Sequence, residues 1–262
     1  MVKFDFAGKS VLVTGAAGAI GKGIAAGFCR SGATVFITDL RADAVAATVA
    51  EVSALGPCRG LAADVTQANQ VAAVVAAAAE AAAGRVDILI NVAGIVGQGK
   101  VEEISEADWE RIFAVNCKGT FLYTREVVPL MKAHRYGRIV NFSSKSGKTG
   151  SALMSHYSAA KAAIIGFTQA LAYELADAGI NVNCVCPGIT ENTGVWSAVS
   201  SGYVENLHMP VEQVVKQFTA KVPLKRLARI EDVVAVTCFL ASTGADYMTG
   251  QAVNVTGGRE MH

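Results

Sequence analysis

The sequence has few charged side chains and no excess of either sign. Of its 262 residues, 17% are Asp, Glu, Lys or Arg, and the formal net charge at pH 7 is +1. A nucleic-acid-binding surface would need a basic patch, which this mixture does not supply. No apolar run reaches the length of a membrane span without a charge, Gly or Pro, and the N terminus lacks a signal-peptide core. We therefore expect a cytoplasmic protein.

The cysteines do not form a metal-binding pattern. There are six, scattered among apolar stretches, and no spacing among them matches a zinc site. We predict buried, reduced thiols and no metal site. The residues are Cys29, Cys58, Cys117, Cys184, Cys186 and Cys238.

Short β-branched runs alternate with longer Ala-rich stretches along the whole chain. The runs are continuously apolar, which is typical of strands buried on both faces of a parallel sheet. We predict an α/β fold with a Rossmann-type doubly wound parallel sheet, as a single domain over 1–262. The expected strands are 10–14, 34–38, 60–64, 87–91, 138–143, 180–186 and 252–255, and the expected helices are 19–31, 42–55, 67–83, 105–116, 119–134 and 155–178.

One segment interrupts this alternation. Residues 190–225 are rich in Ser, Gly, Thr and charge, and they are too many for an ordinary connection between a strand and a helix. We predict that they form a functional lid or a small helical insertion over the substrate.

The first glycine turn, TGAAGAIG at 14–21, follows the first strand and opens the first helix. Such a turn lets a pyrophosphate approach the amides at the helix N terminus. The second strand ends in Asp39, about 20 residues further on, where a carboxylate can accept hydrogen bonds from a ribose. An acid there repels a 2′-phosphate and favours NAD over NADP, although Arg41 is close by; the alternative is that Asp39 is only a turn residue.

A second motif is YSAAK at 157–161, with Tyr157 and Lys161 four positions apart in an expected helix. Residues at this spacing share one helix face. The pair alone is weak evidence, because each residue type is more often a surface or packing residue.

Together these motifs resemble the short-chain dehydrogenase/reductase family over essentially the whole chain. Thr14, Gly15 and Gly21 match its glycine turn, although Ala19, with Gly18 beside it, replaces the middle glycine. NVAG at 91–94 resembles the family's Asn-Asn-Ala-Gly, and TGQAVNVTGG at 249–258 resembles its closing strand. Ser144 stands thirteen residues before Tyr157, as the family's serine does.

The resemblance implies two sets of site residues. The catalytic residues would be Asn116, Ser144, Tyr157 and Lys161. The cofactor-binding residues would be Gly15, Gly18, Ala19, Ile20, Gly21, Asp39, Leu40, Asp64, Val65, Asn91, Ala93, Gly94, Tyr157, Lys161, Pro187, Gly188 and Ile189.

These residue types suit hydride transfer between an alcohol carbon and nicotinamide, which requires a proton to leave the hydroxyl group. Tyrosine has an ordinary pKa near ~10, so we expect Lys161 and oxidised nicotinamide to lower the pKa of Tyr157. Tyr157 is then the general base for oxidation and the general acid for reduction. Ser144 would hold the substrate oxygen, and the family implies that Asn116 positions a water linking Lys161 to solvent.

The substrate is less well defined by the sequence. SKSGKTGS (144–151), KVPLKR (221–226) and QAVNVTGG (251–258) resemble the sorbitol-6-phosphate 2-dehydrogenases within the family. We expect a polyol, sugar or sugar phosphate, with substrate contacts from Lys145, Lys148, Trp196 and His208. Both lysines could instead be solvated. His156 precedes Tyr157 and points elsewhere on the helix.

Two other readings stay open. A 3-oxoacyl-thioester reductase shares the catalytic set but usually uses NADPH and has a shorter lid. A non-catalytic nucleotide-binding regulator of the same fold would be expected to lack Tyr157, Lys161 or Ser144. The family usually forms tetramers, so we expect a homotetramer acting on a small polar molecule, without a nucleic-acid or membrane partner.

Overall fold

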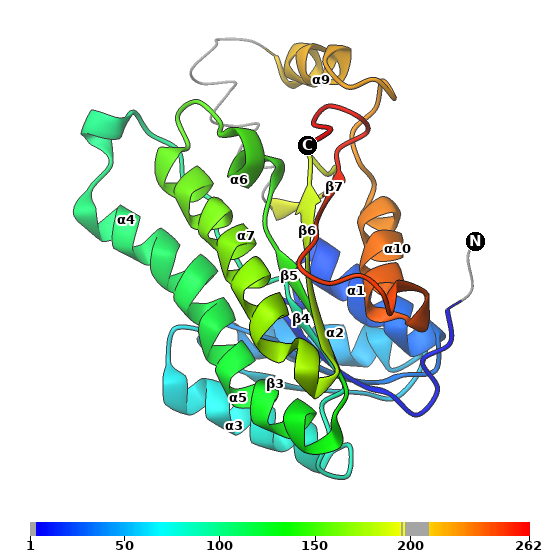
Figure 1. Ribbon diagram of the computed structural model, residues 1–262. Helices are drawn as coiled ribbons and strands as arrows, with labels where there is room; N and C mark the ends of the chain where they lie inside the picture. The colour runs from blue at the N-terminus through cyan, green and yellow to red at the C-terminus, as the bar shows by residue number, and fades with distance from the viewer. Residues whose placement is uncertain (1–3, 195, 197–209) are drawn as a thin grey trace.

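The core of the protein is a seven-stranded parallel sheet. A computed structural model of the chain describes residues 4–194, 196 and 210–262. The strand order is β3-β2-β1-β4-β5-β6-β7 (Figure 1), and every neighbouring pair is parallel. The strands are β1 (Ser10–Thr14), β2 (Thr34–Asp39), β3 (Cys58–Ala62), β4 (Ile88–Asn91), β5 (Gly137–Phe142), β6 (Ile180–Pro187) and β7 (Ala252–Val255). The predicted doubly wound fold is confirmed.

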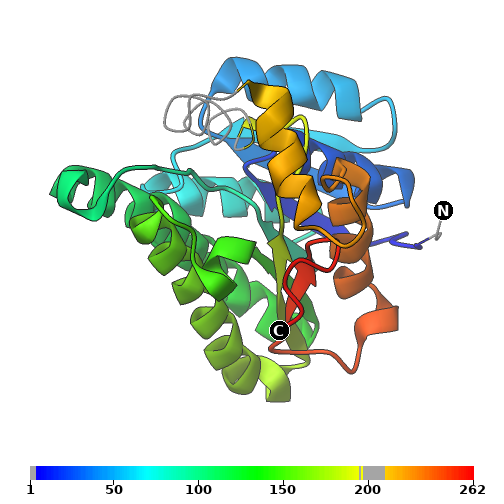
Figure 2. The same ribbon diagram turned by 90° about the horizontal axis from the view of Figure 1, so that it is seen from above.

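Helices cover both faces of this sheet (Figures 1 and 2). They are α1 (Ala19–Arg30), α2 (Ala42–Val52), α3 (Ala68–Glu80), α4 (Glu106–Phe113), α5 (Gly119–His134), α6 (Lys145–Thr149), α7 (Ser155–Leu175), α9 (Val211–Ala220) and α10 (Ile230–Ala241). A π-helical turn, η2 (Ala114–Lys118), joins α4 to α5, and short 3₁₀ turns lie at Val101–Glu103, Ala176–Ala178 and Thr243–Ala245.

The apolar core has two layers, one on each face of the sheet. Val11 and Val13 of β1 pack with α1, α2 and α10, whereas Leu12 between them packs with α3, α5 and α7. Successive strand side chains point to opposite faces, so both faces are buried only if nearly every strand residue is apolar. The expected apolar face of the Ala-rich segment is also confirmed, because Val71, Val74 and Val75 of α3 are buried.

Several element boundaries differ from the sequence prediction. β3 ends at Ala62, so Asp64 lies in the loop after the strand rather than at its end. The helices α6 and α10 were not predicted. α10 packs against α1 and β5 and is apolar on almost all sides, so its sequence lacks the alternation of apolar and polar residues that indicates a helix. All six cysteines are free, with Cys58 and Cys117 half-buried and the other four buried.

The chain changes direction between β1 and β4, which are neighbours at the centre of the sheet although β2 and β3 separate them in sequence. The loops after these strands therefore diverge and leave a crevice at the carboxyl edge, which is where open α/β sheets bind ligands. Thr14 Oγ1 accepts a hydrogen bond of 3.1 Å from the Ala93 amide and ties the two loops together.

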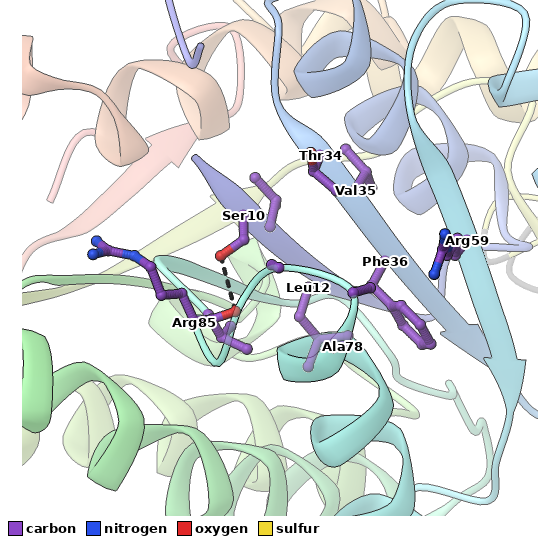
Figure 3. Close-up of a pocket in the computed structure, with 12 residues that line it drawn as sticks. Ser10, Leu12, Thr34, Val35, Phe36, Arg59, Ala78 and Arg85 are labelled. Atoms are coloured by element: carbon purple, nitrogen blue, oxygen red, sulfur yellow. Dashed lines mark hydrogen bonds between the residues drawn. The ribbon is translucent and has the colours of Figure 1, made fainter. Parts of the chain in front are cut away.

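The opposite edge of the sheet holds a much smaller space. A cavity of about 10 Å³ lies beside the amino ends of β1 and β2, where Ser10 Oγ donates a hydrogen bond of 3.1 Å to Arg85 O (Figure 3). That volume accommodates about one water molecule. The cavity is therefore too small for a substrate. In the described part of the chain, none of the helices combines the length and hydropathy that crossing a bilayer requires.

Candidate active site

A cleft of about 1110 Å³ runs along the carboxyl edge of the sheet. Its walls come from the glycine turn after β1, the ends of β2, β4, β5 and β6, the start of α7, and the segment that contains α9. Sites for a single small ligand occupy roughly 300–1,000 Å³. This cleft therefore has room for a dinucleotide and a second small molecule.

The glycine turn forms one end of the cleft. Gly15 has φ of 63°, and a methyl group there would lie 2.7 Å from Ala93 Cα, so only glycine fits. Gly18 is the N-cap of α1 in extended backbone, and Ala19 is the first helical residue, where a side chain is tolerated. The departure from the family's middle glycine therefore does not block the turn. No side chain caps α1 and no acid lies in its first turn, so its amides can receive an anion.

Asp39 is fixed at the end of β2 beside this turn. Its Oδ2 accepts a 3.0 Å hydrogen bond from the Ala17 amide, and its Oδ1 accepts one of 2.8 Å from the Leu40 amide. Arg41, the neighbouring cation, forms an ion pair with Asp43 at 3.5 Å. The carboxylate is thus held in place within the cleft wall, while the charge of the arginine is partly compensated.

Asp64 and Val65 line the same end of the cleft. Asp64 Oδ1 accepts hydrogen bonds of 2.8 Å from the amide and the hydroxyl of Thr66, which fix the carboxylate in a turn. Val65 is buried against Gly119, where a methyl group would lie 2.8 Å from Val65 Cγ2. The contact sets the loop directly on the start of α5.

The four predicted catalytic residues converge in the middle of the cleft. Tyr157 and Lys161 lie one turn apart on α7, Ser144 caps α6 at the end of β5, and Asn116 lies in η2. All four line the cleft. Ser144 Oγ accepts a 3.1 Å hydrogen bond from the Ser146 amide, which fixes the start of α6 beside Tyr157. Residues from three separate segments thus meet where a substrate oxygen could be held.

Lys161 is buried and its ammonium group donates a 2.9 Å hydrogen bond to Phe142 O. Burial lowers the pKa of Lys161 to about 8, opposed by the nearby Cys184, Cys117 and Cys186 thiols. Near neutral pH the Lys161 side chain is therefore still mainly the positively charged ammonium form.

The expected lowering of the pKa of Tyr157 depends on bound oxidised nicotinamide as well as on Lys161, and it stays a prediction. Burial raises the pKa of Tyr157 above its ordinary value, and a hydrogen bond with Ser144 only partly opposes this. The ammonium group of Lys161 lies 5.8 Å from the centroid of the tyrosine ring and donates to a backbone carbonyl instead. Without a cofactor, burial therefore keeps Tyr157 a protonated phenol near neutral pH.

Asn116 has an unusual environment. Its Nδ2 donates 2.9 Å hydrogen bonds to Ile95 O and Ile112 O, while its Oδ1 is buried without a hydrogen-bond partner in the described chain. A methyl group on Gly94 would lie 2.6 Å from this oxygen and 3.1 Å from Lys161 Nζ. Glycine at 94 therefore keeps a space open between an unpaired acceptor and a buried ammonium group.

The remaining predicted residues divide into two groups. Those that line the cleft are Gly15, Gly18, Ala19, Ile20, Gly21, Leu40, Ala93, Gly94, Pro187, Gly188, Ile189, Lys145 and Trp196. Asn91 is not brought into the cleft: it is buried under the sheet edge, where its Nδ2 donates to Asn141 Oδ1 at 2.9 Å. Lys148, three residues after Lys145 on α6, also does not line the cleft. His208 lies outside the described residues.

The sequence interpretation missed several charged residues at the far end of the cleft. Lys221 and Arg259 line it, and Glu260 of the C-terminal tail pairs with Lys145. KVPLKR (221–226) contained Lys221, but neither it nor the tail sequence GREMH (258–262) indicated that the two segments meet at the cleft.

Known proteins resemble this chain over nearly its whole length. The family described as short chain dehydrogenase matches residues 9–203. A 2-dehydro-3-deoxy-L-rhamnonate dehydrogenase (NAD(+)) from Sphingomonas sp. (strain SKA58) is 40% identical over 257 residues, covering 97% of this chain and 96% of that protein. Two solved structures also match. Actinorhodin polyketide ketoreductase with NADPH has 35% identity and a TM-score of 0.93, covering 97% of this chain and 98% of that one. NAD⁺-bound xylitol dehydrogenase has 30% identity and a TM-score of 0.92, covering 97% and 99%.

Proposed function

The chain belongs to the short-chain dehydrogenase/reductase family, and on this premise we propose that it transfers a hydride between NAD and a secondary alcohol or ketone of a polyol, sugar or sugar phosphate. The family comprises oxidoreductases that act on alcohol and ketone groups with a nicotinamide cofactor. The observation that carries the proposal is the convergence of Ser144, Tyr157 and Lys161 in one cleft with Asp39.

The residues present fit a nicotinamide dinucleotide. Gly15 and the uncapped N terminus of α1 leave a cradle for a pyrophosphate, and the Gly94 space beside the unpaired Asn116 Oδ1 leaves room further along. We assign Asp39 to the adenosine ribose, where its fixed carboxylate would repel the 2′-phosphate of NADP. Asp64 and Val65 would contact the adenine.

The chemistry is divided between the cofactor and the protein. Bound nicotinamide supplies the hydride acceptor or donor. Tyr157 exchanges the hydroxyl proton with the substrate, Ser144 holds the substrate oxygen by a hydrogen bond, and Lys161 keeps a positive charge beside both. Asn116 Oδ1 is the acceptor that would hold a water between Lys161 and solvent. Because Tyr157 is the phenol in the free protein, it is ready to protonate a ketone, and oxidation of an alcohol requires it to lose that proton first.

Two relatives support the substrate class. The rhamnonate-derivative dehydrogenase acts with NAD⁺ on a sugar acid by its name, and the xylitol dehydrogenase binds NAD⁺. The polyketide ketoreductase with NADPH represents the alternative, a ketone reductase that uses NADPH. Asp39 argues against that alternative, because its carboxylate would repel the 2′-phosphate of NADPH.

The test is a panel of substrates followed by absorbance of NADH. We expect turnover with NAD on at least one polyol, sugar or phosphorylated polyol, such as xylitol, sorbitol or sorbitol 6-phosphate, and little turnover with NADP. Reduction of an acyl thioester with NADPH, combined with inactivity on the whole panel, would overturn the proposal.

We also propose that the enzyme is a homotetramer in which α4, α5 and α7 pack between subunits. Large apolar side chains on these helices are exposed in the single chain: Trp109 by 43%, Phe121 by 44% and Tyr173 by 90%. Light scattering should give the mass of four chains, and Phe121→Asp should reduce it. An unchanged mass in the variant would show that the surface around Phe121 is not part of a subunit interface.

A further inference from the structure

Three cationic side chains gather at the end of the cleft beyond Ser144. Lys145 follows Ser144 on α6, Lys221 follows α9, and Arg259 lies in the tail after β7. The backbone brings them together, since the Leu224 amide donates a 3.2 Å hydrogen bond to Gly257 O and Pro223 packs against Gly258. Segments from three parts of the chain thus contribute positive charge to one wall (the cationic wall: Lys145, Lys221 and Arg259).

Two other cations that line the cleft, Arg111 and Arg226, are already compensated. Arg111 Nη2 lies 3.0 Å from Asp108 Oδ1, and Arg226 Nη2 lies 3.0 Å from Asp232 Oδ1. The acids that line the cleft, among the residues described, are Asp39 and Asp64 at the adenosine end. No described carboxylate forms an ion pair with Lys221. Apart from Lys161 beside Tyr157, the excess of positive charge that lines the cleft therefore lies in the cationic wall.

Glu260 is the one described carboxylate that meets the cationic wall. Its Oε1 lies 3.8 Å from Lys145 Nζ and 3.3 Å from Arg259 Nε, and its side chain is only 7% exposed. Its Oε2 is buried without a hydrogen-bond partner in the described structure. The tail is held there because the Asn254 and Thr256 side chains both donate to Glu260 O. Glu260 therefore cancels one of the three charges and holds two of them in place.

We propose that the cationic wall binds an anionic oxygen group of the substrate, a phosphate or a carboxylate, and that Glu260 positions the wall and limits its charge. Three cations and one carboxylate leave a net charge of about +2 in a partly enclosed site, where unpaired charge is costly and charge-assisted hydrogen bonds are strong. Lys145 also donates to Gly150 O at 3.1 Å and Ser151 Oγ at 3.2 Å, which directs its ammonium group toward the cleft. This inference rests on the proposed function and narrows its substrate class.

The test compares the effect of opposite charge changes on matched ligands. The probes are sorbitol 6-phosphate, gluconate and sorbitol, and the two readouts are calorimetric binding to the NADH-loaded enzyme and kcat/KM with NAD. Lys145→Gln should lower the preference for the anionic probe over sorbitol about tenfold, because it removes a charge-assisted contact. Glu260→Gln should raise the same preference roughly threefold, because it leaves one more positive charge uncompensated. The stronger of the two anions identifies the group.

The matched control is Lys148→Gln, on the same short helix as Lys145 but outside the cleft, which should leave the preference unchanged. Added salt, from about 20 to about 300 mM, should reduce the preference in the wild type and more steeply in Glu260→Gln. A purely structural role predicts that both substitutions weaken all probes alike, and that result would overturn the inference, as would binding of sorbitol alone. Inactivity on every probe would contradict the proposed function. In that case the ratio of calorimetric affinities for the anionic probes and sorbitol would still test the role of the cationic wall.

Discussion

Tyr157→Phe is expected to reduce kcat by about three orders of magnitude while leaving NAD affinity nearly unchanged. General acid-base catalysis contributes roughly 10²- to 10⁴-fold, and phenylalanine fills the same buried volume without a proton to exchange. The variant also separates an enzyme from a non-catalytic nucleotide-binding protein of the same fold. Steady-state turnover and calorimetric titration with NAD measure the two quantities.

The pH dependence supplies a sharper form of the same test. Burial raises the pKa of Tyr157, so alcohol oxidation by the wild type should increase with pH as the phenol loses its proton. Ketone reduction, which needs the phenol, should decrease over the same range. In Tyr157→Phe the residual oxidation should no longer rise with pH, and the residual reduction should no longer fall. If both trends persisted, another group would be the proton carrier. Tyr247→Phe, at an exposed site outside the cleft and outside the proposed subunit interface, is the control.

Asp39→Ala should change the cofactor preference from NAD toward NADP by about 100-fold in the ratio of kcat/KM values. The substitution removes an acceptor for the ribose hydroxyls, worth roughly 1.5–3 kcal/mol as a charged hydrogen bond, and removes the repulsion of a 2′-phosphate. Arg41, whose side chain is 70% exposed and pairs with the exposed Asp43, can then contact the phosphate.

The matched control for this change is Glu51→Gln. Glu51 is an exposed carboxylate on α2 that pairs with Lys22 at 2.8 Å and does not line the cleft, so its loss should not alter the cofactor ratio. If Asp39→Ala lowered the use of both cofactors equally, the carboxylate would be a structural turn residue, held by the Ala17 and Leu40 amides, and not the selector.

Sequence alone predicted what depends on local pattern. Continuous apolar runs predicted the strands, because a strand buried on both faces of a sheet must be apolar at nearly every position. The four-residue spacing of Tyr157 and Lys161 placed them on one helix face, and the resemblance to the family placed Ser144 with them. The path of the glycine turn could not be predicted from Ala19, because it depends on the residue at which α1 begins. In the structure Gly18 takes the N-cap position and Ala19 is the first helical residue.

What the sequence missed depends on contacts between distant segments. Asn91 matched a motif, but its amide turns toward Asn141, a pairing set by the register of β4 and β5. The pKa of Tyr157 depends on burial that only the assembled cleft provides. Lys145 and Lys148 were equivalent in sequence, and only the assembled structure distinguishes Lys145, which lines the cleft, from Lys148, which does not.

The C-terminal tail has a consequence for how this enzyme could diverge. Glu260 and Arg259 are held mainly by hydrogen bonds and ion pairs and belong to neither apolar layer of the core. A change of residue there alters the charge at the cleft and leaves the packing of the sheet intact. Substitutions in these few residues can therefore change the charge presented to a substrate without repacking either apolar layer, while Ser144, Tyr157 and Lys161 stay fixed.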